Sequence, residues 1–153
     1  MNLIKSPLFE NKKIGFKKLR TNVSDILNDV INNNNVIFSE NAKKNNADTA
    51  VIISKTVLEN ILSVYTFNPI SKYDDKTSQY EVIIDELNIY ACGDTKEDAV
   101  EMLLDLVIDS TNEYFENTDL YFKLPEQKAK YPYFLLIKQC RDREHLKNVL
   151  NLI

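Results

Sequence analysis

A cluster of cations near the N-terminus is the part of this sequence best suited to bind a ligand. Lys12, Lys13, Lys17, Lys18 and Arg20 lie close together, with Lys5 just before them and only Glu10 against them. The stretch from Ile14 to Val30 predicts a short extended piece followed by an amphipathic helix. Lys17, Lys18 and Arg20 then crowd the first helical turn, where the backbone dipole is already positive. A chain that keeps cations there is expected to offer them to an anion, such as a nucleic-acid phosphate.

This helix is expected to bury one apolar face, because its large aliphatic residues recur at helical spacing. They are Leu19, Val23, Ile26, Leu27, Val30 and Ile31. Asn22 suits a contact with an adenine edge. A solvated basic surface is the alternative interpretation of the cations, and a packing or capping role is the alternative for Asn22.

An acidic stripe is the second pattern that suggests binding. Five carboxylates follow one another at i+4 spacing: Glu97, Glu101, Asp105, Asp109 and Glu113. Like charges at this spacing repel one another along a helix edge, so the stripe favours a basic protein as its partner. A solvated helix face is the other interpretation. The charge is also divided along the chain: residues 1–63 have nine Lys or Arg against six Asp or Glu, whereas residues 64–153 have ten against seventeen.

Catalysis and metal binding have little support in the sequence. His145 is the single histidine, and Cys92 and Cys140 are too far apart in sequence for a typical zinc pattern. No phosphate-binding loop, nucleophile elbow or metalloprotease motif is present, so we expect no enzyme activity, cofactor, metal or small-molecule substrate. Two cysteines and the lack of a signal peptide suggest the cytoplasm, and no apolar run approaches the roughly 20 residues of a membrane helix.

The predicted fold class is α+β, in two parts. Residues 14–62 predict the order β-α-β-β-α, with strands at 36–38 and 49–53 and with Ser54 as the N-cap of a helix. A polar stretch at 66–79 suggests a linker, and residues 80–84 and 87–91 suggest two strands. Thr95 and Asp98 predict the cap of a long helix, Pro132 a first helical turn, and Asp142 the cap of a last helix. The long helix is expected to bury Ala99, Met102, Leu103, Leu106, Val107 and Tyr114.

The first part of the chain resembles the Phd/YefM (prevent-host-death) antitoxin domain over about residues 12–65. The matching segments are Ile14 to Ile26, Val36 to Ser39 and Ala50 to Lys55, in the family's order and spacing. The resemblance implies a homodimer that binds operator DNA, represses its own operon, and blocks a cognate toxin, usually an RNase, through its C-terminal part. Glu40-Asn41 departs from the arginines that the family often has after its first hairpin strand.

The segment from Tyr80 to Leu106 resembles HicB-type antitoxin domains. The residues that carry this likeness are Gly93, Asp94, Thr95, Glu97, Asp98 and Ala99. Residues 116–153 resemble no family.

The two resemblances suggest one function. The chain is predicted to be a type II antitoxin, with residues 1–65 as a Phd/YefM-like dimerisation and DNA-binding domain. Residues 80–153 form a smaller HicB-like acidic domain that binds a basic RNase toxin. The alternative is a protein-interaction module with this fold that does not bind DNA, which Glu40 and the acidic overall charge favour.

Overall fold

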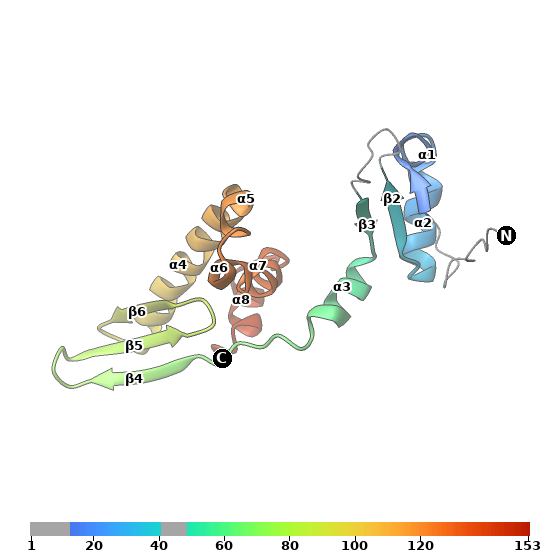
Figure 1. Cartoon of the computed structure of the whole chain (residues 1–153). Coiled ribbons are helices and arrows are strands. Elements are labelled where there is room, and N and C mark those ends of the chain that lie inside the picture. The colour runs from blue at the N-terminus through green and yellow to red at the C-terminus, as the bar shows by residue number, and fades with distance from the viewer. Residues whose placement is uncertain (1–12, 41–48) are drawn as a thin grey trace. The chain divides into compact units, whose positions relative to one another are not determined.

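A computed structural model describes residues 13–40 and 49–153, with Lys13 described by its backbone alone. The chain divides into two compact units, Met1–Ile61 and Leu62–Ile153. Figure 1 labels the elements of both units. The fold is a mixture of helices and two small sheets, as the sequence predicts.

The first unit is built on a three-stranded sheet in the order β1-β2-β3. Strand β1 pairs in parallel with β2, and β2 pairs antiparallel with β3, with Ile37 opposite Ile52. The two strands predicted around residues 36–38 and 49–53 are therefore present. The elements are β1 (Lys13–Gly15), α1 (Phe16–Thr21), α2 (Val23–Asn33), β2 (Ile37–Glu40), β3 (Thr49–Ile52) and α3 (Lys55–Leu62).

The single helix predicted within the stretch from Ile14 to Val30 is wrong, because the helix is interrupted at Asn22. The backbone of Asn22 leaves the helical region, at φ −123° and ψ 28°. Asn22 is therefore both the C-cap of α1 and the N-cap of α2. The apolar spacing misses this break because Leu19 and Val23 keep helical spacing across it.

The ends of α2 and α3 are held by side-chain hydrogen bonds. Asn34 ends α2 in the left-handed conformation, at φ 52°. Its side-chain oxygen accepts a hydrogen bond of 2.9 Å from the hydroxyl of Ser54. The Ser54 oxygen in turn accepts from the backbone N–H of Val57 at 3.1 Å, which confirms the predicted N-cap.

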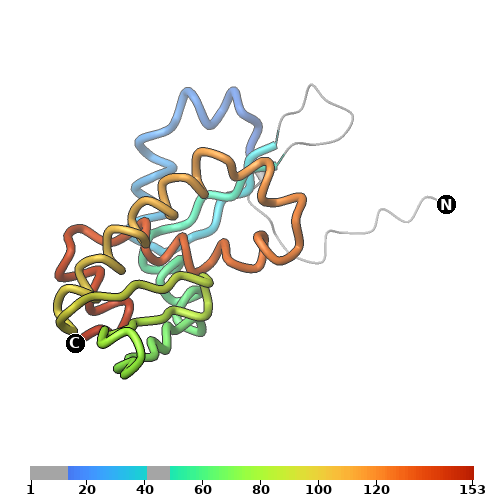
Figure 2. The backbone as a smooth tube through the Cα atoms, turned by 90° about the vertical axis from the view of Figure 1, so that its left-hand side faces the viewer, coloured from blue at the N-terminus to red at the C-terminus, as the bar shows by residue number. Residues whose placement is uncertain are grey.

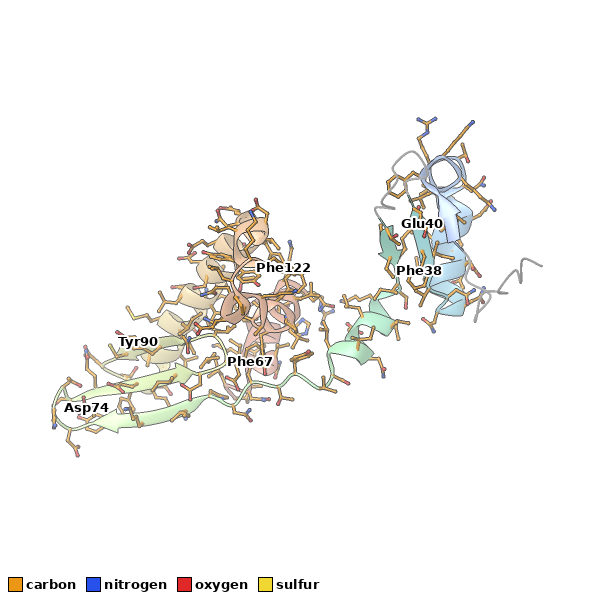
Figure 3. All side chains as sticks on the ribbon, viewed as in Figure 1. Phe38, Glu40, Phe67, Asp74, Tyr90 and Phe122 are labelled. Atoms are coloured by element: carbon orange, nitrogen blue, oxygen red, sulfur yellow. The ribbon has the colours of Figure 1, made fainter. Side chains whose placement is uncertain are left out.

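The second unit begins earlier than the sequence suggests. The predicted linker at 66–79 contains strand β4 (Ile70–Asp74), which pairs antiparallel with β5 (Gln79–Ile84), and β5 pairs with β6 (Ile89–Gly93). The sequence did not predict this strand because the polar residues between β4 and β5 make the whole stretch resemble a linker in composition. Asp74, labelled in Figure 3, accepts hydrogen bonds from the Lys76 N–H at 2.9 Å and the Thr77 hydroxyl at 3.1 Å. These bonds hold the pKa of the Asp74 carboxyl below its ordinary value.

Helix α4 (Lys96–Glu116) covers β5 and β6, as Figures 1 and 2 show. Its predicted cap is confirmed, because the Thr95 hydroxyl accepts from the Asp98 N–H at 3.1 Å and donates to the Asp98 carboxylate at 2.7 Å. The predicted core face is partly wrong. Met102 and Leu106 are 51% and 40% exposed, whereas Val100 and Leu104 are buried. The buried face is turned toward 100 and 104 because α4 packs both on the sheet and on α7 and α8.

Four shorter helices complete the core of the second unit around Tyr114 of α4. The Tyr114 ring stacks on Phe134 with a centroid distance of 4.4 Å, and its hydroxyl donates to the Gln127 carbonyl at 2.7 Å. Asp142 caps the last helix through the His145 N–H at 2.8 Å, as predicted. The helices are α5 (Thr118–Tyr121), α6 (Pro125–Lys128), α7 (Tyr131–Lys138) and α8 (Arg143–Val149).

Candidate nucleic-acid and partner interfaces

The basic cluster lies on α1 and at its boundary. The side chains of Lys17, Lys18 and Arg20 are exposed, and none forms an ion pair with another residue in the described part of the chain. Lys13 contributes its backbone to β1, opposite Phe38, while Lys12 lies outside the described residues. The structure thus places three of the five predicted cations on one short helix.

The electrostatic argument for these cations changes with the helix break. Because α1 ends at Thr21, Lys18 and Arg20 occupy its last turn rather than the first turn of a long helix. Cations near a helix C-terminus are stabilised by the backbone dipole. Their presence therefore needs no anion to explain it, and their exposure is what supports an interface.

Asn22 lies at the junction of α1 and α2 and is exposed. Its backbone N–H donates to the Lys18 carbonyl at 3.0 Å, and its carbonyl accepts from the Ile26 N–H at 3.0 Å. Its side chain makes no capping hydrogen bond at the start of α2. Beside it is a hollow of about 540 Å³ that Lys18, Asp25 and Ile26 help to line. The Asn22 amide is thus placed beside the basic helix, available to a base or a backbone.

Glu40 lies at the end of β2, where Figure 3 labels it with Phe38. Residues alternate along a strand, so Phe38 and Glu40 share the face opposite to the buried Ile37 and Ser39. Glu40 is half-buried and has an interaction partner of its own.

An apolar stripe runs along the outside of α2. Val23, Leu27 and Ile31 are spaced one turn apart and are 42%, 39% and 63% exposed. Among the described residues of this unit, the side chains that are buried include only two large apolar ones, Val30 and Ile37. The described part of the first unit therefore leaves a row of large apolar side chains on α2 exposed.

The acidic stripe lies along α4 as predicted, but its middle is already paired within the chain. Arg143 of α8 donates to Glu101 and Asp105, with N–O distances of 2.8 Å each. Lys147 of α8 contacts the other Glu101 oxygen at 2.7 Å. Hydrogen bonds from Lys147 and then Arg143 hold the pKa of the Glu101 carboxyl below its ordinary value.

The remaining carboxylates of the stripe differ in whether they have a partner within the described part of the chain. The Glu113 carboxylate accepts a hydrogen bond of 3.0 Å from the Tyr121 hydroxyl. Glu97 and Asp109 are exposed and have no ion pair or hydrogen-bonded side chain among the residues that the structure describes. The sequence argument missed the role of Arg143 and Lys147, although their i+4 spacing matches that of the acids they meet.

The residues considered for catalysis do not converge. His145 accepts a long hydrogen bond of 3.3 Å from the Arg141 N–H. Cys92 lies on β6, whereas Cys140 lies between α7 and α8, and the two form no disulfide. Within residues 13–40 and 49–153, no group of three or more histidine, cysteine or acidic side chains is arranged to hold a metal ion. In the same part of the chain, no helix has the length and apolar character needed to cross a membrane.

Comparisons with known proteins identify the family. A family model described as the antitoxin of toxin–antitoxin, RelE/RelB, systems matches residues 11–152. A crystal structure from Syntrophomonas wolfei subsp. wolfei, described as the antitoxin part of a proposed toxin/antitoxin system, has a similar fold. It superposes with a TM-score of 0.74 and 18% identity, covering 90% of this chain and 94% of that one. No curated protein matches the chain. Because the family model spans nearly the whole sequence, the chain belongs to the RelE/RelB-type family of antitoxins.

Proposed function

We propose that this antitoxin acts as a homodimer of the Phd/YefM type that binds operator DNA and neutralises a basic RNase toxin by covering it. The first unit provides the dimer and the DNA contact, and the second unit, HicB-like over β5, β6 and α4, provides the toxin contact. The chain acts by binding alone, without catalysis, in the cytoplasm. Three sets of residues support the proposal, one for each contact.

The observation that supports DNA binding most directly is the exposure of Lys17, Lys18 and Arg20 without carboxylate partners in the described part of the chain. Phosphate contacts by Lys and Arg release condensed counterions, so affinity falls as salt rises. Two copies of α1 in a dimer present six such cations, which corresponds to a slope of about −5 in log affinity against log salt.

The test is a titration of the full chain into duplex DNA from upstream of its own gene, at several salt concentrations. Binding with a steep salt dependence, stronger than to a shuffled duplex, supports an autorepressor. The second candidate function is an interaction module without DNA binding, which Glu40 beside the basic helix favours. A chain that binds its toxin but shows no preference for any duplex at low salt indicates that second function.

The apolar stripe of Val23, Leu27 and Ile31 supports a homodimer. Burial of a large aliphatic side chain contributes about 1.5 to 3 kcal/mol. A two-fold interface uses the same patch on both copies, so each of these residues counts twice. A second copy packed on this stripe would bury its exposed side chains and enlarge the small apolar core of the first unit.

We expect the double variant Leu27→Asp/Ile31→Asp to be monomeric at concentrations of about 10–100 µM, where the native chain is a dimer. The charges face an apolar partner surface and cannot be desolvated without a large cost. Light scattering after size-exclusion chromatography measures the mass directly. The matched control is Ile153→Asp, at an 88% exposed residue of the second unit, which leaves the mass unchanged. A double variant that keeps the dimer mass refutes this interface.

The toxin contact rests on the acidic stripe, and specifically on Glu97 and Asp109. These two carboxylates are exposed and free of internal cations in the described chain, whereas Glu101 and Asp105 are shared with Arg143. An RNase needs positive charge to hold RNA, and a complementary acidic face both steers its approach and covers that charge. We therefore place the first encounter with the toxin at the two ends of the stripe.

For Glu97→Lys/Asp109→Lys we expect affinity for the toxin encoded beside this chain to fall at least about tenfold, mainly through a slower association rate. Surface-based binding kinetics at low and at physiological salt provide the measurement. The control, Asp75→Lys/Asp85→Lys, makes the same change in net charge at exposed residues outside the stripe. Equal losses in the two variants would show a general charge effect and no site on α4.

A further inference from the structure

The outward side of helix α4 carries two large apolar side chains that its periodicity predicts in the core. Met102 is 51% exposed and Leu106 is 40% exposed, and their i+4 spacing places them one turn apart on the same face. Apolar residues that are exposed singly are ordinary on a protein surface, whereas an adjacent pair forms a continuous patch. This apolar pair, Met102 and Leu106, is therefore the part of α4 best suited to pack against another molecule.

Carboxylates lie at both ends of the apolar pair. Asp98 lies one turn before Met102, whereas Asp109 and Glu113 lie one and two turns after Leu106. The carboxylates of Asp98 and Glu113 accept hydrogen bonds from hydroxyl groups, which leave their negative charge in place. None of the three acids forms an ion pair within the described part of the chain.

The cations of α8 neutralise only the other flank of the acidic stripe. Arg143 and Lys147 pair with Glu101 and Asp105. Successive residues of an α-helix point about 100° apart, so Met102 is turned by that angle around α4 from Glu101. The apolar pair therefore lies beside the carboxylates that have no cation, and not beside those that α8 has already paired.

The charge of α4 limits what can cover the apolar pair. The helix has seven carboxylates and one cation, Lys96, and the two cations of α8 still leave the carboxylates in excess. DNA, RNA and anionic lipid have the same sign of charge as this surface, and so does the α4 of a second copy, so all of them are repelled. A protein segment with Lys or Arg around its own apolar side chains is complementary to this surface in both charge and polarity.

We propose that the apolar pair binds a basic amphipathic segment of the cognate toxin. Four residues at a rise of 1.5 Å separate Met102 from Leu106, so the toxin segment presents two apolar side chains about 6 Å apart. Its Lys or Arg residues meet Asp98 at one end of the pair and Asp109 and Glu113 at the other. A methionine suits such a surface, because its flexible thioether adapts to the shape of a partner.

This inference rests on the proposed function, since the toxin is the occupant, and it adds a second kind of contact to it. The unpaired carboxylates act at long range and attract the toxin, whereas the apolar pair acts only after contact and holds it. The two contributions therefore affect different rates, association for the carboxylates and dissociation for the apolar pair.

Binding kinetics separate the two contributions. For Met102→Gln/Leu106→Gln in the full-length chain, we expect the toxin encoded beside this chain to dissociate at least about tenfold faster. The association rate should change less than about twofold, because every carboxylate that steers the approach is retained. The effect should be the same at low and at physiological salt, in contrast to the salt-dependent effect of Glu97→Lys/Asp109→Lys.

The matched control is Leu120→Gln/Leu124→Gln, at residues 54% and 48% exposed that follow the C-terminal end of α4. It should leave both rates within about twofold, and both variants should keep the native Tm within a few degrees, as surface substitutions usually do. If the native chain binds the toxin and Met102→Gln/Leu106→Gln dissociates no faster than the native chain or the control, this inference alone is overturned. A native chain that does not bind the toxin overturns the proposed function together with the inference.

Photo-crosslinking identifies the segment of the toxin that is bound. A photoreactive benzoylphenylalanine at position 102 of the full-length chain is irradiated in the complex with the toxin, and mass spectrometry locates the crosslinked peptide. We expect that peptide to contain apolar residues flanked by Lys or Arg, and the same photoreactive group at position 120 should not crosslink to it. A crosslink from position 102 to a segment without basic residues, or no crosslink in a complex that forms, contradicts the assignment.

Discussion

Alanine at Lys17, Lys18 and Arg20 together is expected to lower affinity for operator DNA at least about 100-fold at roughly 0.1 M salt. These residues are exposed on α1, and a dimer loses six cations at once. The salt slope should flatten by about 5 units, because the counterions that those contacts release remain on the DNA. Titrations at four or five salt concentrations measure both quantities with the same duplex.

The matched control for this variant is alanine at Lys76, Lys96 and Lys123, which are exposed on the second unit and give the same change in net charge. It should reduce affinity only slightly, since cations beyond a Debye length of about 10 Å from the DNA are screened. The proposal of an α1 contact is lost if the two triple variants behave alike. Light scattering must show that both variants keep the mass of the native chain, because a change of oligomeric state would alter DNA binding for a different reason.

Gly93→Ala is expected to destabilise the second unit by about 2 to 3 kcal/mol, close to the upper end for an overpacked site. An added Cβ at Gly93 meets the backbone nitrogen of Ala99 at 2.5 Å and the carbonyl carbon of Asp98 at 2.8 Å. These are backbone atoms in the first turn of α4, so relief requires the helix to move away from β6. For a unit of this size, the corresponding drop in Tm is about 10–20 °C, measurable by calorimetry.

Gly15→Ala is the control for this second variant, since it is the same chemical change with no heavy atom within 4 Å of the added Cβ. Gly15 has an extended backbone, at φ −71° and ψ 155°, which alanine adopts without strain. Its cost should stay under about 1 kcal/mol, the difference between glycine and alanine as an N-cap. Similar losses of stability at both glycines would indicate that close packing at Gly93 is not the cause.

The caps are the part of the fold that the sequence predicts best, because a capping residue acts on backbone groups two or three residues away. Ser54, Thr95 and Asp142 all form the predicted bonds. Local chemistry determines these positions, and distant contacts leave them unchanged. The same locality explains why the start of α4 was placed correctly from the Gly93-Asp94-Thr95 segment.

Features that depend on neighbours distant in sequence were predicted less well. The buried face of α4 is rotated away from Met102 and Leu106 by packing against α7 and α8, which no local pattern records. Strand β4 is concealed by a polar stretch and is defined by its pairing with β5. The break at Asn22 leaves the apolar spacing intact, so periodicity alone could not locate it.

In the candidate interfaces, too, local features were predicted and those that depend on residues distant in sequence were not. The sequence predicts which charged residues lie on α1 and α4, because that depends on counting along the chain. It could not predict that Arg143 and Lys147 occupy the middle of the acidic stripe, since those residues come from a helix about 40 positions away. A hollow of about 550 Å³ lined by residues of α4, α7 and α8 likewise exists only where these helices meet.

The contact between Arg143 and Glu101 gives α8 a tolerance to mild acid. Because the pKa of Glu101 is lowered in the folded chain, its pairing stabilises the fold at every pH above the carboxyl's unfolded value. That contribution declines as the pH falls below the unfolded value and is gone once the pH has passed the lowered folded value. At a pH between the two values, an ordinary surface glutamate would be largely protonated, whereas Glu101 would still be ionised and paired with Arg143 of α8.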